Sequence, residues 1–302
     1  MGTHLNPDGD ALGCALAMGE FLEQRGIPHE IVCHHAPPSN LGFLPKAWKI
    51  IKEPKEKHSL GIILDLDSLE RLGSLEPEFE ECERIIVIDH HIPHTAPGQL
   101  RIEDTTAAAT AVILTELFLQ IGAEITPTMA TCLLTGIITD TGCFRFRNTD
   151  ARALHLAAKL LELGADISTI NEEIFQRKPV AAVRLLGIAF ENMQMCCDDR
   201  LCWSWVTHED FTESGGSDEN TEGFVNELLS IQTVDIAMIA RETRENRVRV
   251  SLRSRSGFDV AEVARAFGGG GHKNAAGCSF DEPVETALEK LLPKVRECLA
   301  SS

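Results

Sequence analysis

The sequence has no run of apolar residues long enough to cross a membrane, because a spanning helix needs roughly 18 to 20 of them in succession. Its N-terminus also lacks the basic and then apolar pattern of a secretory signal peptide. Basic residues are scarce: 28 lysines and arginines face 46 aspartates and glutamates, which gives a formal net charge of −18. This charge repels polyanions and argues against a long nucleic acid as partner, whereas metal ions and a few arginines can still hold a short anionic substrate. We therefore predict a cytoplasmic protein with neither a membrane nor a long nucleic acid as partner.

The ten cysteines include no pair with C-x-x-C spacing. Most of them lie inside apolar runs, which is typical of buried free thiols in a reducing compartment. A disulfide framework and a zinc ribbon are therefore not expected, because both need cysteines in characteristic spacings.

Residues 1–165 alternate apolar runs of strand length with helical patterns. A helical pattern covers residues 11–26, and a later helix begins after Thr126 as its N-cap. Short runs rich in β-branched residues predict strands covered on both faces, at 29–33, 60–66 and 84–88. The alternation of strands and helices predicts a parallel α/β sheet for this first domain.

A second, smaller α/β domain is predicted at residues 191–302, after a helical linker at 166–190. Its strands are expected at 200–206, 234–242 and 247–254, with a turn at 244–247. A helix at 259–267, the run "GGGGH" and a final helix at 283–300 complete the domain. The predicted architecture is therefore an α/β chain of two domains.

Acidic and histidine side chains stand at four places where a predicted strand or helix begins or ends. In a parallel α/β sheet, ligands collect beyond the carboxyl ends of the strands. The residues at these four places are His4, Asp8 and Asp10, then Asp65, then Asp89, His90 and His91, and finally Asp140. A single aspartate in such a position is more often a turn residue or a helix N-cap than a ligand. Four such groups in one domain favour a shared site.

Divalent cations are the simplest explanation for this convergence, because the acids would otherwise repel one another and lose hydration. Carboxylates with a minority of imidazoles suit Mn²⁺, with Mg²⁺ or Co²⁺ as substitutes. The number of ligands predicts two ions that share a bridging carboxylate, about 3.5–4 Å apart. Such a pair generates hydroxide near neutral pH and holds a phosphoryl group for in-line attack.

Five motifs together resemble those of the DHH phosphoesterases with a DHH-associated C-terminal domain. In order, they are "THLNPDGDALG", "ILDLDSLERLG", "VIDHH", "GIITDTGCFRF" and "GGGGHKNAAGCSF". The second half of the chain resembles the branch of oligoribonucleases that are also phosphatases of 3′-phosphoadenosine 5′-phosphate (pAp). The resemblance covers nearly the whole chain, and motifs in this order are far more specific than a single DHH tripeptide.

The resemblance implies a role for each residue of the predicted metal site. His4, Asp8 and Asp65 would hold one cation, and Asp65 would bridge to the second, which is held also by Asp10, His90 and Asp140. Asp89 and His91 are expected to act in catalysis, with His91 orienting or contacting the phosphate. Arg71 and Arg145 are candidate phosphate contacts, and either is equally typical of a surface ion pair.

In this family the second domain binds the rest of the substrate, so the resemblance implies an active-site cleft between the two domains. Glycines allow an anion to approach backbone amides closely, so the glycine run is a candidate binding loop rather than a flexible linker. Arginine and histidine side chains would add charge-assisted hydrogen bonds to a terminal phosphate. The predicted substrate-binding residues are Arg253, Ser254, Gly269, Gly270, Gly271 and His272, beside Arg71.

The implied activity is a two-metal hydrolase that releases 5′ mononucleotides from short RNA or DNA, or converts pAp to AMP and phosphate. Alternatives are a cyclic or linear dinucleotide phosphodiesterase, a family II pyrophosphatase, which the "GGGGHKNAAG" motif disfavours, and a non-catalytic nucleotide-binding module. The resemblance also suggests a homodimer. Relatives have a helix and a strand before the opening histidine, where this sequence has only "MGT". We therefore expect a truncated first strand: either the preceding stretch is missing from this sequence, or the fold has lost a central strand, and in that second case the sheet has a gap beside the metal site.

Overall fold

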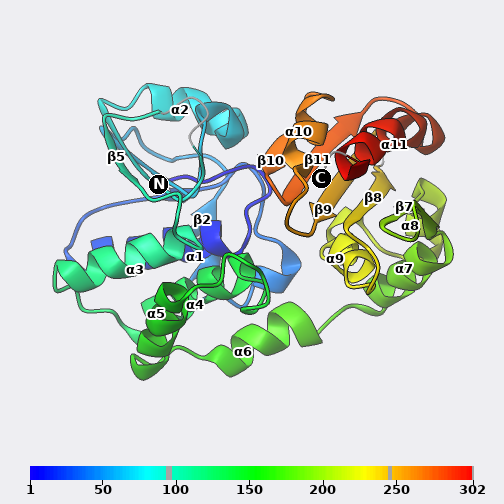
Figure 1. Cartoon of the computed structure of the whole chain (residues 1–302). Helices are drawn as coiled ribbons and strands as arrows, with labels where there is room; N and C mark the ends of the chain where they lie inside the picture. The colour runs from blue at the N-terminus through cyan, green and yellow to red at the C-terminus, as the bar shows by residue number, and fades with distance from the viewer. Residues whose placement is uncertain (93–96, 244–246, 301–302) are drawn as a thin grey trace. The chain divides into compact units, whose positions relative to one another are not determined.

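The computed structural model describes residues 1–92, 97–243 and 247–300 (Figure 1). The chain divides into two compact units, Met1–Arg177 and Lys178–Ser302. Most of the turn predicted at 244–247 lies outside the described residues. Within the described ranges, no helix combines the length and the apolar character that a membrane span requires.

The first unit is built on a parallel sheet, as the sequence predicts. β3 (Leu60–Leu64), β4 (Arg84–Asp89) and β5 (Leu100–Glu103) pair side by side in that order, and β1 (Ile31–Val32) pairs with β2 (Ile50–Ile51). The sequence did not indicate β2 or β5. Both are short and only partly buried, so neither carries the continuous apolar run that marks a covered strand.

The first three residues of the chain lie between β1 and β3. Gly2 forms parallel bridges to Val32 and to Ile63. Backbone hydrogen bonds run from the amide of Val32 to the carbonyl of Met1 (2.9 Å) and from the amide of Leu64 to the carbonyl of Gly2 (3.1 Å). The alternative of a gap in the sheet is therefore wrong, because Gly2 links the two pairs of strands, and His4 lies two residues further along the chain.

Helices cover both faces of this sheet. Alternate strand residues point to opposite sides and therefore pack into two different cores. Ile62 and Leu64 pack into the larger core with the long helices, whereas Ile63 packs into a smaller core. The larger core is formed by α1 (Gly9–Gln24), α3 (Thr110–Gln120), α4 (Pro127–Asp140), α5 (Ala151–Glu162) and α6 (Ile167–Asn171). The smaller one is formed with η3 (Leu69–Leu75) and α2 (Glu76–Glu80). The remaining short turns are η1 (Ser39–Leu41), η2 (Ala47–Lys49) and η4 (Glu172–Gln176).

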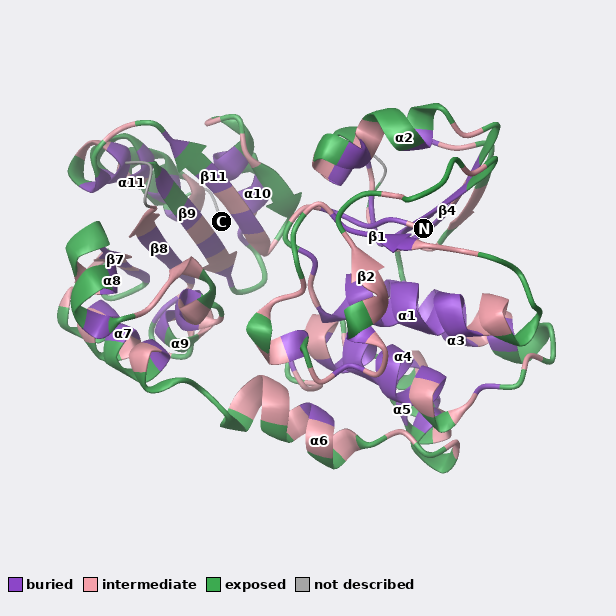
Figure 2. Ribbon diagram, turned by 180° about the vertical axis from the view of Figure 1, so that it is seen from behind, coloured by how far each residue is buried: buried purple, intermediate pink, exposed green. Residues whose placement is uncertain are grey.

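α1 and α4 are buried along most of their length and pack closely against each other (Figure 2). A Cβ atom on Gly13 would lie 2.3 Å from the carbonyl oxygen of Cys132. A Cβ on Gly136 would lie 2.5 Å from the Asp10 carboxylate. Glycine at these two positions therefore brings the start of α1 against α4. The N-cap prediction for α4 is also confirmed, since the Thr126 hydroxyl accepts from the amide of Met129.

The described part of the second unit contains a mixed sheet in the order β10, β11, β9, β8, β7, β6. β7 and β8 are parallel, and the other neighbours are antiparallel. One face packs against α10 and α11, and the other against α7, α8 and α9. The strands are β6 (Gln194–Cys196), β7 (Leu201–Val206), β8 (Ile236–Glu242), β9 (Val248–Ser254), β10 (Gly270–His272) and β11 (Ala275–Phe280). The helices are α7 (Val180–Glu191), α8 (His208–Ser214), η5 (Asp218–Thr221), α9 (Phe224–Leu229), α10 (Val260–Arg265) and α11 (Val284–Ala300).

The segment expected to be a helical linker contributes to both units. Ile170 of α6 belongs to the core of the first unit. Leu185 and Ala189 of α7 belong to a core of the second unit. The division between the units falls at Arg177 and Lys178, between these helices.

Candidate metal centre

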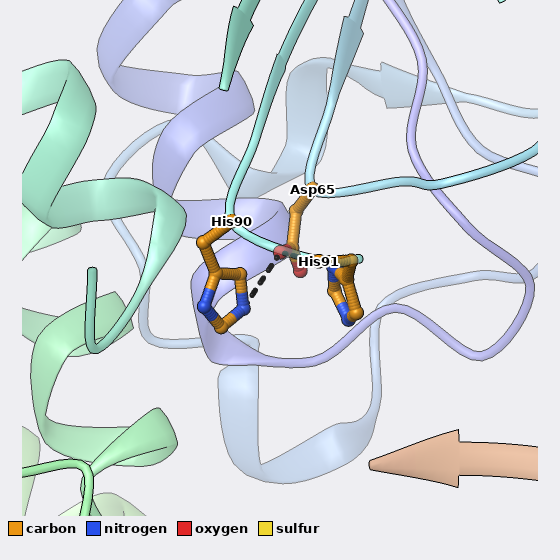
Figure 3. A group of neighbouring side chains, drawn as sticks. All are labelled: Asp65, His90 and His91. Carbon is orange, nitrogen blue, oxygen red and sulfur yellow. Dashed lines mark ion pairs between the residues drawn. The ribbon is translucent and has the colours of Figure 1, made fainter. Parts of the chain in front are cut away.

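The acidic and histidine residues singled out in the first unit gather at the carboxyl edge of its sheet. Asp65 directly follows β3, and Asp89 is the last residue of β4. Because the strands are parallel, their carboxyl ends meet at one edge, and the side chains that follow them come together. In Figure 3 the side chains of Asp65, His90 and His91 lie beside one another at the ends of these strands.

A first cluster contains His4, Asp8 and Asp65, with one nitrogen or oxygen from each within 4.8 Å of the others. His4 Nε2 lies 3.4 Å from one oxygen of Asp65 and 3.8 Å from one oxygen of Asp8. The other Asp8 oxygen caps α1 by accepting from the amides of Asp10 and Ala11. Asp8 therefore caps a helix with one oxygen and faces the histidine with the other.

A second cluster contains Asp10, His90 and Asp140, again within 4.8 Å. His90 Nε2 lies 3.2 Å from an oxygen of Asp140, which is the last residue of α4. Asp10 comes from the first turn of α1, and the glycine contacts between α1 and α4 hold these helices together. Each cluster contains the residues that the family resemblance assigns to one ion. The single difference is that the resemblance places Asp65 on both ions, whereas Asp65 is a member of the first of these two clusters only.

Asp65 lies between the two clusters. Its Oδ2 faces His4, whereas its Oδ1 is 3.5 Å from His90 Nε2 and 3.6 Å from His91 Nδ1. The residue is buried and adopts a left-handed backbone conformation with φ of 59°, which is unusual outside glycine. Such strain persists only where the surroundings hold the residue in place, and it is frequent at functional sites. The geometry suits a carboxylate that serves both clusters.

Two of the three histidines beside Asp65, His4 and His90, have their ring orientation fixed by backbone carbonyls. His4 Nδ1 lies 2.8 Å from the carbonyl of Leu5, and His90 Nδ1 lies 3.1 Å from the carbonyl of Ala107. A carbonyl can only accept, so each Nδ1 carries a proton and each Nε2 is directed at the carboxylates. This is the usual arrangement of a metal-ligating histidine.

The charges in the site shift these groups strongly. Burial alone would lower the pKa values of His4 and His90, but the neighbouring carboxylates outweigh it and raise them to about 10 and about 11. Burial and the charges of Asp65 and Asp140 raise the pKa of Asp10. Burial also raises the pKa of Asp140, to about 6, against the opposing effect of His90. These shifts follow from several carboxylates and imidazoles that are held close together away from water.

Asp89 and His91 form a pair beside these clusters. His91 Nδ1 lies 2.7 Å from Asp89 Oδ1, and Asp89 is fully buried. Burial opposes protonation of His91, but the hydrogen bond to Asp89 and the charge of Asp65 raise its pKa. Asp89 therefore orients His91, and a further cluster of metal-ligand type joins His91 with Asp65 and His90.

Two arginines predicted to contact phosphate already have partners in the first unit. The Arg71 guanidinium pairs with Asp67 at 3.1 Å. The backbone carbonyl of Arg71 accepts from the amide of Leu5, which is next to His4 in the chain. Arg145 Nε donates to the carbonyl of Gly142 at 2.7 Å, two residues after Asp140. The structure therefore gives both residues a part in holding the loops around the site, and their contact with phosphate stays a prediction.

In the second unit, residues of β9, β10 and β11 share one face of the sheet. His272, Ala275 and Arg253 are consecutive cross-strand neighbours, and Gly270, Gly277 and Ser251 form the next row. Cross-strand partners point to the same side, so a histidine and an arginine flank a floor of small residues. Side chains cannot replace glycine at two places here, since a Cβ on Gly269 or on Gly271 would lie 2.2 or 2.5 Å from a carbonyl oxygen.

Ser254 lies apart from this face. Its hydroxyl donates to the carbonyl of Phe258 at 3.1 Å and accepts from the Asn274 amide at 2.8 Å. Adjacent strand residues point to opposite sides, so Ser254 and Arg253 do not share a face. The structure thus gives the Ser254 side chain a role in fixing the turn before β11.

The best matches to known families divide the chain as its fold does. Residues 2–137 match the N-terminal domain of the DHH family, and residues 200–301 match the DHHA1 domain. The chain is 34% identical over 297 residues to the "bifunctional oligoribonuclease and PAP phosphatase NrnA" of Thermus thermophilus, covering 98% of this chain and 88% of that protein. The chain belongs to the DHH family. The NrnA protein of Bacillus subtilis, a further similar member, is 26% identical over 280 residues, or 92% of this chain and 87% of the relative.

Solved structures agree with this assignment to the DHH family. An exopolyphosphatase-related protein from Bacteroides fragilis superposes with a TM-score of 0.90 at 27% identity, covering 99% of this chain and 92% of that one. A putative family II inorganic pyrophosphatase from Methanococcus jannaschii has a TM-score of 0.50 at 19% identity, covering 91% and 93%. The second likeness concerns the fold alone. The resemblance inferred from the five motifs is therefore confirmed.

Sequence reasoning missed residues that support the DHH site. His34 and His35 follow β1 at the same sheet edge, and His35 Nδ1 accepts from the amide of Asn6 at 3.1 Å. The rule applied to Asp65 and Asp89, that polar residues after a strand reach this edge, would have found them. Thr110 donates to Asp65 at 2.9 Å, and its position at a helix start gave no comparable signal.

Proposed function

We propose that this DHH family chain is a hydrolase that cleaves phosphate esters with two divalent cations, Mn²⁺ as the physiological ion and Mg²⁺ or Co²⁺ as substitutes. The observation that carries the proposal is Asp65, whose two oxygens face two separate ligand clusters. Shared carboxylates of this kind are the usual bridge in two-metal sites. When bound, two such cations lower the pKa of water and neutralise a phosphoryl group during in-line attack.

The donor set fits hard or borderline cations. It consists of carboxylate oxygens and imidazole nitrogens, which suit Mn²⁺ better than the soft metals that prefer thiolates. The nearest thiol, Cys14, donates to Asp10 at 3.4 Å, and burial, followed by the charge of Asp10, raises its pKa. Cys14 therefore stays protonated and does not compete as a ligand.

Residues of the first unit would position the phosphate, and His91 would donate a hydrogen bond or a proton to it. Asp89 holds the Nδ1 proton of His91, so His91 presents its other nitrogen outward for a hydrogen bond to a phosphate oxygen or a leaving group. The fixed carbonyl contacts of His4 and His90 keep their Nε2 atoms aimed at the carboxylates. These restraints supply the preorganised geometry that phosphoryl transfer requires.

The substrates proposed are short oligonucleotides, cleaved to 5′ mononucleotides, and pAp, cleaved to AMP and phosphate. Both are named in the descriptions of the Thermus and Bacillus relatives, over nearly the whole length of this chain. Arg253 and His272 would bind a phosphate beside the small residues Gly270 and Ala275. The cytoplasmic location and the homodimer stay predictions.

The test is hydrolysis of pAp, a linear dinucleotide and a five-residue RNA in Mn²⁺, with product identified by chromatography. We expect 5′ mononucleotides from the oligomers, AMP from pAp, and no product after chelation with EDTA. Asp65→Asn should abolish turnover, because the shared carboxylate loses its charge. Glu81→Gln is the control, since Glu81 is an exposed acid paired with Lys57. Full turnover by Asp65→Asn would overturn the proposal, and cleavage of the dinucleotide alone would favour a dinucleotide phosphodiesterase.

A further inference from the structure

Thr110 joins two of the proposed ligands that come from distant parts of the chain. Its hydroxyl donates to Asp65 Oδ1 at 2.9 Å, and its backbone amide donates to Asp10 Oδ2 at 2.6 Å. All of these groups are buried. The ligands lie 45 and 100 residues away from Thr110 in sequence, so one residue fixes two otherwise independent segments.

The start of α3 explains why Asp10 is held there. Ala109 precedes the helix and provides no side-chain cap. The first amides of a helix have no partner within the helix and must find an acceptor elsewhere. Asp10 supplies it by accepting from the amides of Thr110 and Ala111 at 2.6 and 2.9 Å. Asp10, the proposed ligand from α1, therefore takes the place of the missing side-chain cap at the start of α3.

The same position explains why the Thr110 hydroxyl is directed at Asp65. A threonine inside a helix commonly donates to the carbonyl four residues earlier. Thr115, one turn further along α3, does so by donating to the carbonyl of Ala111 at 2.6 Å. Thr110 is the first residue of α3, so the residue four positions before it is not helical. Its hydroxyl bonds the ligand instead of its own helix.

We propose that Thr110 is a positioning residue that sets the separation and orientation of the Asp10 and Asp65 carboxylates. The proposal rests on the proposed function, because it assumes that these carboxylates bind cations. Hydrogen bonds to ligating carboxylates fix their geometry, and their loss weakens metal binding even though they never touch the metal. The backbone amide remains after any substitution at position 110 except proline, so a change of side chain removes only the hydrogen bond to Asp65.

The test compares Thr110→Val, which keeps the shape and removes the hydroxyl, with Thr110→Ser, which retains it. Thr115→Val is the matched control, because Thr115 is an equally buried threonine of the same helix that contacts neither ligand. Mn²⁺ binding is measured by calorimetry on each purified full-length chain. We expect Thr110→Val to weaken at least one ion by about 10- to 100-fold. Thr110→Ser should bind nearly as wild type, and Thr115→Val should bind as wild type.

Kinetics give a second readout. With Mn²⁺ at a fixed level that saturates the wild type, Thr110→Val should lower kcat more than it changes KM for pAp, and Thr110→Ser should restore kcat. If Thr110→Val unfolds, Thr110→Ala is measured by the same criterion. Equal Mn²⁺ affinity in the hydroxyl-free variant and in Thr115→Val would overturn the positioning role. A wild-type chain that binds two Mn²⁺ ions but hydrolyses nothing would overturn the proposed function alone, whereas one that binds none would overturn both.

Discussion

The contact between α1 and α4 can be tested by adding a single methyl group. A Cβ on Gly13 would lie 2.3 Å from the carbonyl oxygen of Cys132 and 3.1 Å from its carbonyl carbon. Both are backbone atoms of a buried helix, so no side chain can turn aside. To reach an ordinary contact of 3.4 Å, the two helices must separate by about 1 Å.

Gly13→Ala should therefore destabilise the first unit and disturb the site together. Overpacking of a close-packed core costs about 1–3 kcal/mol. A loss of about 2 kcal/mol lowers Tm by about 6 °C in a domain of this size. Asp10 lies almost one turn before Gly13 on the same helix and faces Asp140 of α4 across the contact. A displacement of about 1 Å there should lower kcat by about 100-fold.

The assay is thermal unfolding of the metal-free chain, followed by Mn²⁺ calorimetry and pAp hydrolysis. Gly187→Ala is the control, since Gly187 is a helical glycine whose added Cβ would meet nothing within 4 Å. It should gain up to about 1 kcal/mol from helix propensity, so the difference between the variants isolates the steric clash. A Gly13→Ala chain with the Tm and the Mn²⁺ affinity of the wild type would refute the argument that the glycine holds the two helices together.

Three further predictions follow from contacts in the first unit. Asp89→Asn should lower kcat by about 100-fold while Mn²⁺ binding persists, because a neutral amide, which can donate as well as accept, replaces the charged acceptor that fixes the Nδ1 proton of His91; unchanged kcat in a pAp assay would remove His91 from the reaction. Hydrogen bonds from Thr106 and Arg152 lower the pKa of Asp104 to about 2, so its stabilisation is present above the ordinary value of 3.8 and disappears as the pH falls towards 2. In urea unfolding, Asp104→Asn should cost about 1 kcal/mol at pH 7, with solvent screening taken into account, and the cost should shrink below pH 3.8. Mn²⁺ at 100 times its dissociation constant should stabilise the chain by about 2.7 kcal/mol in calorimetric scans, and a Tm that is the same with Mn²⁺ and with EDTA would contradict a folded-state cation site.

The sequence was most informative where an apolar strand pattern is followed directly by an acidic residue. The runs before Asp65 and Asp89 are short, apolar and rich in β-branched residues, so they predicted both the strands and the edge at which the acids meet. Parallel pairing then follows from the helices that alternate with the strands. Three strands of the second domain, β7, β8 and β9, were predicted within one or two residues of their observed ends, whereas no bounds were predicted for β6, β10 and β11.

Other features depend on contacts that no local pattern records. β2 has two residues and intermediate burial, so it carries neither a long apolar run nor an alternation. The insertion of Gly2 between β1 and β3 depends on backbone hydrogen bonds, to which a residue without a side chain gives no sequence signal. The pairing of Arg71 with Asp67 needed only a spacing of four residues, yet that spacing is too common to be weighed against a phosphate contact.

Asp8 and Asp10 show why the ordinary and the functional interpretation of an aspartate need not exclude each other. The sequence left open whether such residues are helix N-caps or metal ligands. Asp8 caps α1 through one oxygen and turns the other towards His4, and Asp10 caps α3 from a different helix. A helix N-terminus carries partial positive charge and unpaired amides, so it both anchors a carboxylate and fixes its direction. The two caps place these carboxylates before any cation arrives, and helix capping is thus the means by which this sequence assembles its acidic site.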